Sequence, residues 1–220
     1  MVISSRASIS VYPALYFLKR KWLWKAFIID SMVKILPIFS QAFQASVISA
    51  LAYASLFYIN SLLTSELVFG LGVNWIYLPA GLRLFLTLIF GLPGAIGISL
   101  ASFLIAYLGE FPHDLTLCLG VGLISGFAPY IARGFIFGNI DLQSDLGNLS
   151  IQKLMSCILV YALLCAGLHQ LWYAAEGLEN AGTFNHFLVM FIGDVLGSIL
   201  LIAVIKYALD SLKKARKRVY

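Results

Sequence analysis

Long apolar runs separated by short polar stretches dominate the pattern of this chain. A helix that crosses a membrane needs about 20 consecutive, mainly apolar residues. The pattern therefore predicts an all-α fold, a polytopic bundle of about six transmembrane helices. The predicted helices lie at residues 42–63, 76–91, 93–109, 115–135, 153–173 and 186–209.

The second and third predicted helices are short, and the tight sequence Gly91-Leu92-Pro93-Gly94 connects them. Pro93 cannot continue a regular ladder of helical hydrogen bonds, and the flanking glycines tolerate turn geometry. A single kinked helix over residues 82–108 is the alternative, and it would give five spans instead of six.

The basic residues predict the orientation of the bundle, because Lys and Arg accumulate in cytoplasmic flanks of membrane proteins. Nine of them lie in two clusters near the ends of the chain, at residues 19–25 and 213–218. The connecting segments 64–74, 109–114 and 174–185 contain no Lys or Arg. We therefore expect both termini in the cytoplasm, which requires an even number of spans.

Residues 21–39 form an apolar stretch that Asp30, Lys34 and Pro37 interrupt. Such a segment is typical of an amphipathic helix that lies in the membrane interface, here on the cytoplasmic face. The alternative is a seventh span. The predicted organisation is an N-terminal interfacial segment at 1–41, a six-helix transmembrane domain at 42–209 and a basic cytoplasmic tail at 210–220.

The composition excludes several functional classes. Hydrophobic residues make up 61% of the 220 residues and charged residues 11%. The net charge of +5 is concentrated beside predicted membrane segments, where it acts as a topology signal, so we expect the lipid bilayer and not nucleic acid as partner. No catalytic triad, phosphate loop or paired-carboxylate motif is recognisable, so we do not expect an enzyme, and the sequence leaves any cofactor unidentified.

Arg83 and Asp194 are charged residues that lie in the interior of predicted spans, away from the helix ends. Arg83 lies about 12 Å along its helix from Trp75, and Asp194 about 13 Å along its helix from Asn185, at 1.5 Å per residue. Both helices are predicted to run from outside to inside, so the two side chains lie at similar depth. Ionisable residues at this depth mark functional sites, and we predict an ion pair or a ligand-binding site at Arg83 and Asp194.

Two motifs surround these charges. The stretch from Asn74 through Tyr77, Pro79 and Gly81 to Arg83 predicts an irregular helix start, which survives at membrane depth only when protein or water satisfies its backbone. An ordinary proline-initiated helix is the alternative. The pair Gly193 and Gly197 around Asp194 permits close packing against a neighbouring segment. Further glycine pairs, Gly122 with Gly126 and Gly134 with Gly138, predict helix packing in the same way, and Pro93 belongs to the packing positions.

All three histidines, His113, His169 and His186, are predicted at outer helix ends near acidic residues. Imidazole and carboxylate groups suit several divalent metals. No pair has the spacing of a recognised metal motif, so the histidines are weak metal candidates only.

The residues Tyr77-Leu78-Pro79-Ala80-Gly81-Leu82-Arg83, then Gly91-Leu92-Pro93-Gly94-Ala95, then Gly193-Asp194 with Gly197 resemble the bacterial membrane-associated sensor (MASE) domain of the first type. The resemblance covers residues 70–205. It implies an integral membrane sensor domain of the bacterial inner membrane, with Pro79, Gly81, Asp194 and Arg83 as signature residues. Family members usually carry a cytoplasmic output domain, so this chain is expected to be a stand-alone version.

The expected function is therefore a sensor-like protein of signal transduction that binds a small ligand or a membrane partner through an outward-facing pocket around Arg83 and Asp194. A small transporter, or the substrate-binding subunit of one, is the first alternative. A structural or accessory subunit of a larger membrane complex is the second. Another membrane protein and a second copy of this chain are the candidate protein partners.

Overall fold

The structure is a computed structural model that describes residues 12–111, 114–140, 142–143, 146–179 and 181–219. The described residues are 83% helical. It divides into two units with the boundary between Ala42 and Phe43, and the site described below belongs entirely to the second. The helices are α1 (Tyr12–Leu63), α2 (Leu78–Phe90), α3 (Leu92–Ile105), α4 (Leu115–Asn139), α5 (Ile151–Ala175) and α6 (Phe184–Val219).

Three short elements connect α1 to α2, and one extends α3. The 3-10 helix η1 (Ser65–Leu67) is followed by the strands β1 (Val68–Gly70) and β2 (Val73–Asn74), and the π-helical segment η2 (Ala106–Glu110) follows α3. The two strands form an antiparallel hairpin in which Val68 pairs with Asn74. Gly72 has φ +67°, a conformation that glycine adopts without a steric cost.

Among the residues that the structure describes, five helical segments are long and apolar enough to cross a membrane. This finding agrees with the predicted all-α bundle and is the pattern of a multi-pass membrane protein. The five segments are Pro37–Leu63, Leu92–Gly109, Leu115–Asn139, Ile151–Ala175 and Phe184–Lys214. The sixth, α2, is a shorter apolar helix of 13 residues. At 1.5 Å per residue its length is about 20 Å.

The predicted N-terminal amphipathic segment is not a separate helix. Residues 21–39 lie inside the 52-residue α1, and Pro37 is accommodated within it. Helix-breaking residues are tolerated in membrane helices when neighbouring groups satisfy the freed backbone, so the proline alone does not end α1. The location of residues 21–39 on the cytoplasmic face stays a prediction.

The connection at Gly91 separates α2 from α3, so the alternative of one kinked helix is wrong. Gly91 has φ +60°, which favours glycine. A Cβ on Gly94 would lie 2.8 Å from the carbonyl oxygen of Leu86, so α3 folds back against α2 immediately after the turn. Pro93 lies in the first turn of α3, where its missing N–H costs no helical hydrogen bond. The Pro93 carbonyl accepts a hydrogen bond of 2.8 Å from the hydroxyl of Ser46 in α1.

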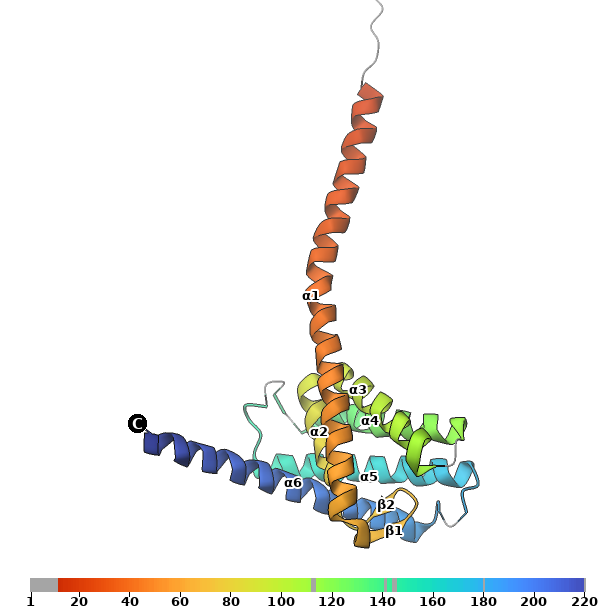
Figure 1. Ribbon diagram of the computed structural model, residues 1–220. Helices are drawn as coiled ribbons and strands as arrows, with labels where there is room; N and C mark the ends of the chain where they lie inside the picture. Colours follow the sequence, from red (N-terminus) through yellow and green to blue (C-terminus); the bar gives the residue numbers. More distant parts are fainter. Residues whose placement is uncertain (1–11, 112–113, 141, 144–145, 180, 220) are drawn as a thin grey trace, which may run out of the picture. The chain divides into compact units, whose positions relative to one another are not determined.

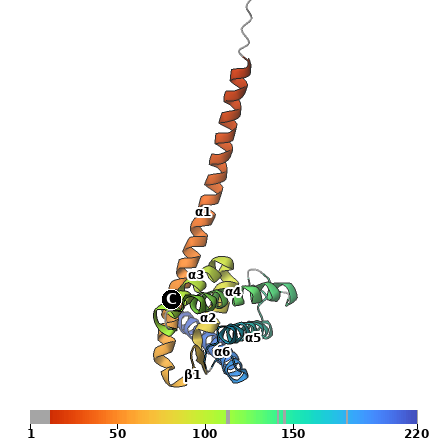
Figure 2. The ribbon, with the colours of Figure 1, turned by 90° about the vertical axis from the view of Figure 1, so that its right-hand side faces the viewer.

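The short helix α2 occupies the centre of the second unit. It contacts α3, α4, α5 and α6, and these four helices also pack in sequence order against one another. Figure 1 shows α4, α5 and α6 running alongside one another, and Figure 2 shows them grouped around α2 when the molecule is turned by 90°. The main buried cluster joins α2, α4 and α5, with Leu84, Ala132 and Tyr161 among its members.

The glycine pairs in α4 behave differently from one another. A Cβ on Gly126 would overlap the backbone of Ala95, and one on Gly122 would lie 2.8 Å from Phe103, so both allow α4 to approach α3 closely. Gly134 and Gly138, also predicted to pack, have no atom within 4 Å of such a Cβ among the described residues. The packing prediction for this second pair is therefore wrong for the described part of the chain, because no described segment packs on these two glycines.

Candidate functional site

The glycines of α6 hold an extended segment of chain. A Cβ on Gly193 would overlap the carbonyl oxygen of Asn74, and one on Gly197 would overlap the carbonyl group of Tyr77. The Tyr77 N–H donates a hydrogen bond of 3.1 Å to the Gly193 carbonyl. The close partner of this glycine pair is thus the backbone that leads into α2, and not the side of another helix.

The start of α2 is fixed from α1 and α6 together. The N–H of Leu78 donates to Oδ1 of Asn60 in α1 over 2.9 Å. Pro79 occupies the first turn of α2, where it has no hydrogen bond to lose. A Cβ on Gly81 would lie 2.8 Å from the Cα of Ser198, so α2 and α6 touch backbone to backbone. These contacts set the direction in which Arg83, one turn further on, enters the bundle.

Arg83 is buried, with 4% of its surface exposed. Its Nη2 group donates hydrogen bonds to the hydroxyls of Tyr53, over 2.5 Å, and Tyr77, over 3.0 Å. The guanidinium carbon lies 4.9 Å from the ring centre of Tyr53 and 5.1 Å from that of Tyr77, close enough for cation–π attraction to both rings. Nη1 approaches the Sγ atom of Cys165 at 3.7 Å. Polarizable, hydrogen-bonding groups therefore surround this cation.

Asp194 is buried more deeply, with 1% exposed. Neither carboxylate oxygen has a hydrogen-bond partner in the part of the chain that the structure describes, so no hydrogen bond joins the predicted ion pair of Arg83 and Asp194. Nη2 of Arg83 is directed at the hydroxyls of Tyr53 and Tyr77, and its buried Nε has no hydrogen-bond partner among the described residues. Asp194 remains within electrostatic range of Arg83 and of Cys165. The structure thus brings the two predicted charges into one neighbourhood without joining them directly.

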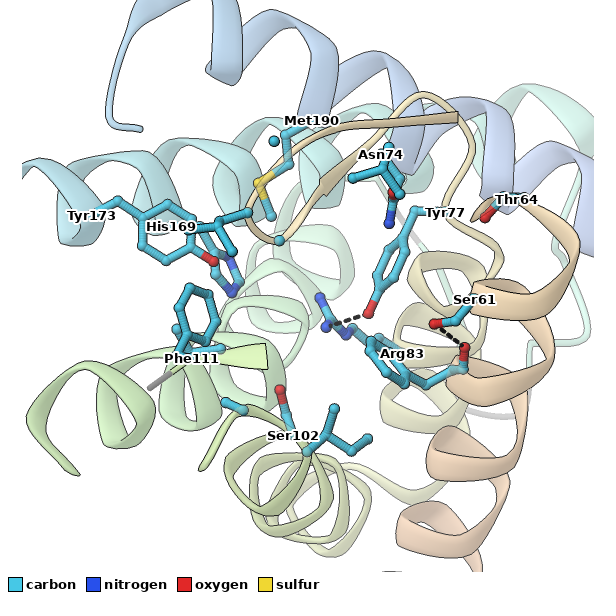
Figure 3. A pocket seen from close by; sticks show the side chains of 18 of the residues that line it. Ser61, Thr64, Asn74, Tyr77, Arg83, Ser102, Phe111, His169, Tyr173 and Met190 are labelled. Atoms are coloured by element: carbon cyan, nitrogen blue, oxygen red, sulfur yellow. Dashed lines mark hydrogen bonds between the residues drawn. The ribbon is translucent and has the colours of Figure 1, made fainter. Parts of the chain in front are cut away.

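A cavity of about 340 Å³ opens beside Arg83, and its volume lies at the small end of the range for small-molecule sites, about 300–1,000 Å³. Figure 3 shows the guanidinium beside Tyr77, with Phe111, His169 and Tyr173 on the opposite wall. Asn74 also lines the cavity, and its buried Oδ1 has no hydrogen-bond partner among the described residues. Asp194 does not line it. Further lining residues come from α1, the β hairpin, α3, η2 and α6: Phe57, Ser61, Val68, Gly70, Ile105, Ala106 and Met190.

His169 belongs to a chain of buried hydrogen bonds at this wall. The hydroxyl of Ser102 in α3 donates to that of Ser125 in α4 over 2.8 Å, and Ser125 lies 3.4 Å from Nε2 of His169 in α5. Nδ1 of His169 lies 2.9 Å from the carbonyl oxygen of Cys165. Because a carbonyl only accepts, Nδ1 carries a proton and Nε2 can accept from Ser125. The ring thus links α3, α4 and α5 through buried hydrogen bonds.

The two histidines that the structure describes have different surroundings. His169 is buried beside the cavity, and His186 lies at the start of α6, where its Nδ1 is 2.7 Å from the hydroxyl of Thr183. His113 lies outside the described residues. Within the described ranges, no group of three or more His, Cys, Asp or Glu side chains is placed to hold a metal ion.

Sequence reasoning missed four residues of the site: Tyr53, Asn60, Ser102 and Ser125. Tyr53 and Asn60 were available as polar positions seven residues apart on one face of the first predicted span, a spacing of two helical turns. The two serines gave no signal, because small hydroxyl residues are common packing residues in membrane helices.

Comparison of the chain with protein-family models, with curated proteins and with solved structures gives no match. The resemblance to the membrane-associated sensor domain therefore stays a prediction.

Proposed function

We propose that this chain is a sensor-like multi-pass membrane protein that binds a small ligand in the cavity beside Arg83. The resemblance to the first type of membrane-associated sensor domain supports a bacterial inner-membrane location and a role in signal transduction. In this proposal the cavity faces outward, and a cytoplasmic or membrane partner reads the ligand-bound state.

The observation that carries the proposal is a buried cation in the wall of a cavity. Burying an arginine costs free energy that hydrogen bonds to neutral hydroxyls repay only in part. Arg83 is nevertheless held there by contacts from Tyr53 in α1 and Tyr77 before α2. A residue retained at such a cost favours a binding role over a packing role.

The position of the cavity supports its outward direction. Its lining includes Ser65 and Leu71 from the segment between α1 and α2, and Phe111 from the segment after η2. These belong to the connections that contain no Lys or Arg. Under the charge rule, the same connections lie outside the cytoplasm.

We expect a mixed panel of small acids, amines and neutral compounds to contain at least one that raises the melting temperature of the detergent-purified protein. Ser61 is an exposed residue at the cavity, and Ser61→Trp should abolish this stabilisation by filling the entrance. The matched control Ser55→Trp, on the exposed face of the same helix, should respond like wild type. Stabilisation that survives in Ser61→Trp would place the ligand elsewhere, and uptake of the same compound into proteoliposomes would favour the transporter alternative.

The predicted topology gives a further test. Cysteines introduced at the exposed Ser65 and Glu179 should react with an impermeant maleimide in intact cells, and one at Ser211 should react only after lysis. The three native cysteines are buried, so they should contribute little background. Labelling of Ser211→Cys in intact cells would overturn the assignment of both termini to the cytoplasm.

A further inference from the structure

We propose that the ligand of this cavity is a small organic monoanion, a carboxylate on an apolar or aromatic body. This inference rests on the proposed function, because it names the chemical class of ligand for the same cavity. Three features of the wall carry it: its charge, its free hydrogen-bond donors and its apolar remainder.

The charge of the wall is positive. Arg83 is the only Lys, Arg, Asp or Glu among the described residues that line the cavity. Both ring nitrogens of His169 have partners inside the bundle, the Cys165 carbonyl for Nδ1 and the Ser125 hydroxyl for Nε2. The carboxylate of Asp194 lies outside the lining. A wall with one cation and no carboxylate favours a ligand with a single negative charge. A second negative charge on the ligand would lose its water in the cavity without gaining a cation as partner.

The hydroxyl groups beside Arg83 leave a donor for this anion. The hydroxyls of Tyr53 and Tyr77 lie 3.0 Å apart, and either can donate to the other. Both hydroxyl oxygens also accept a hydrogen bond from Arg83. The hydrogen bond between the two tyrosines therefore takes one phenolic proton, and the proton of the other hydroxyl is left to donate elsewhere. The remaining O–H and the guanidinium together present charge-assisted donors to an oxyanion, the arrangement that binds carboxylates strongly.

The rest of the wall is apolar and aromatic. Phe57, Ile105, Phe111, Val121 and Met190 line the cavity together with the ring of Tyr173. An inorganic anion remains hydrated on all sides, so it would make few favourable contacts with this apolar surface. It fits an organic acid whose carboxylate meets Arg83 and whose body contacts the opposite wall, within about 340 Å³.

The charge preference can be measured without knowing the natural ligand. Ser61→Cys places a thiol at the cavity, and Asn185→Cys places one at an exposed position that does not line it. Their reaction rates are compared with two methanethiosulfonates of similar size, one with a sulfonate and one with a trimethylammonium group. We expect the sulfonate-to-ammonium rate ratio to be about tenfold higher at Ser61→Cys, as a nearby unscreened cation would produce. Arg83→Gln should remove the difference, and Arg83→Lys should retain most of it.

Benzoate, benzamide and benzylamine test the body and the charge together, as acid, neutral amide and amine of the same ring. Millimolar benzoate should slow modification of Ser61→Cys at least about tenfold and raise the melting temperature, and the other two should do neither. Equal rate ratios at the two cysteines would contradict the proposal that the ligand is a monoanion. Equal protection by benzamide and benzoate would contradict it too, and either result would still be compatible with a small-molecule site. Absence of protection by benzoate would contradict the proposal that the cavity binds an aromatic acid. The rate ratios of Ser61→Cys and Asn185→Cys are both measured in proteins that keep Arg83. The test therefore holds even if Arg83→Gln fails to fold.

Discussion

Alanine at Gly197 is expected to lower the free energy of unfolding of the bundle by about 3 kcal/mol, the upper end of the usual cost of overpacking. The added methyl group would overlap the carbonyl group of Tyr77. The neighbouring atoms are backbone, so no side chain can move aside. Relief requires the segment before α2 to shift, which would break the hydrogen bond from the Tyr77 N–H to Gly193. Thermal melting in detergent measures the loss.

The matched control is Gly134→Ala in α4. No described atom lies within 4 Å of a Cβ at this position, and alanine is favoured over glycine inside a helix by about 1 kcal/mol. Gly134→Ala should therefore leave the melting temperature unchanged or raise it. Equal losses in the two variants would show that the contact between α6 and the Tyr77 segment is not the cause.

Loss of the Arg83 side chain should be the second large effect. Arg83→Ala leaves the Asp194 carboxylate in a dry site without the nearest cation and should cost about 3 kcal/mol, the lower end for a broken buried pair. The double change with Asp194→Ala should cost less than the sum of the single changes, because it removes the uncompensated charge as well. Melting of wild type, both single variants and the double variant gives the coupling free energy.

A second arginine provides the control for this cycle. Arg133 lies in α4, where Nε donates to the carbonyl of Leu88 over 3.5 Å and the guanidinium stacks on Phe137. Arg133→Ala combined with Asp194→Ala should show additive losses, since no contact between the two is described. Additivity in the Arg83 cycle as well would mean that Arg83 and Asp194 do not stabilise each other. Tyr53→Phe should then account for most of the contribution of Arg83, through the hydroxyl that accepts from it.

The sequence alone was sufficient for the helices of the bundle, because apolar runs of membrane length have few other solutions. The predicted helix at 153–173 lies within α5, and the one at 115–135 lies within α4. The continuity of α1 through Pro37 was missed, because a proline and two charges normally argue for a break. The turn at Gly91 was left between two alternatives, since a positive φ is a property of packing that sequence spacing does not show.

The sequence predicted the two charged residues of the candidate site but not the side chains that contact them. Arg83 and Asp194 stood out because buried ionisable residues are rare in membrane helices. Depth along a helix could show that they lie at similar levels, but not which side chain reaches the guanidinium first. Tyr53 reaches it from α1, 30 residues away in sequence, and that proximity depends on the position of α1 against α3.

The extended entry to α2 gives the two ends of the bundle different mechanical properties. At one end, hydrogen bonds from Leu78 to Asn60 and from Tyr77 to Gly193 tie α1, α2 and α6 together, and parting these helices would strand polar backbone in an apolar medium. At the other end, α2 and α6 meet around an apolar hollow of about 160 Å³ lined by residues such as Leu88 and Ile205. Aliphatic contacts have no preferred direction and can slide. Relative movement of α2 and α6 is therefore expected to be smaller at the tied end than toward the hollow.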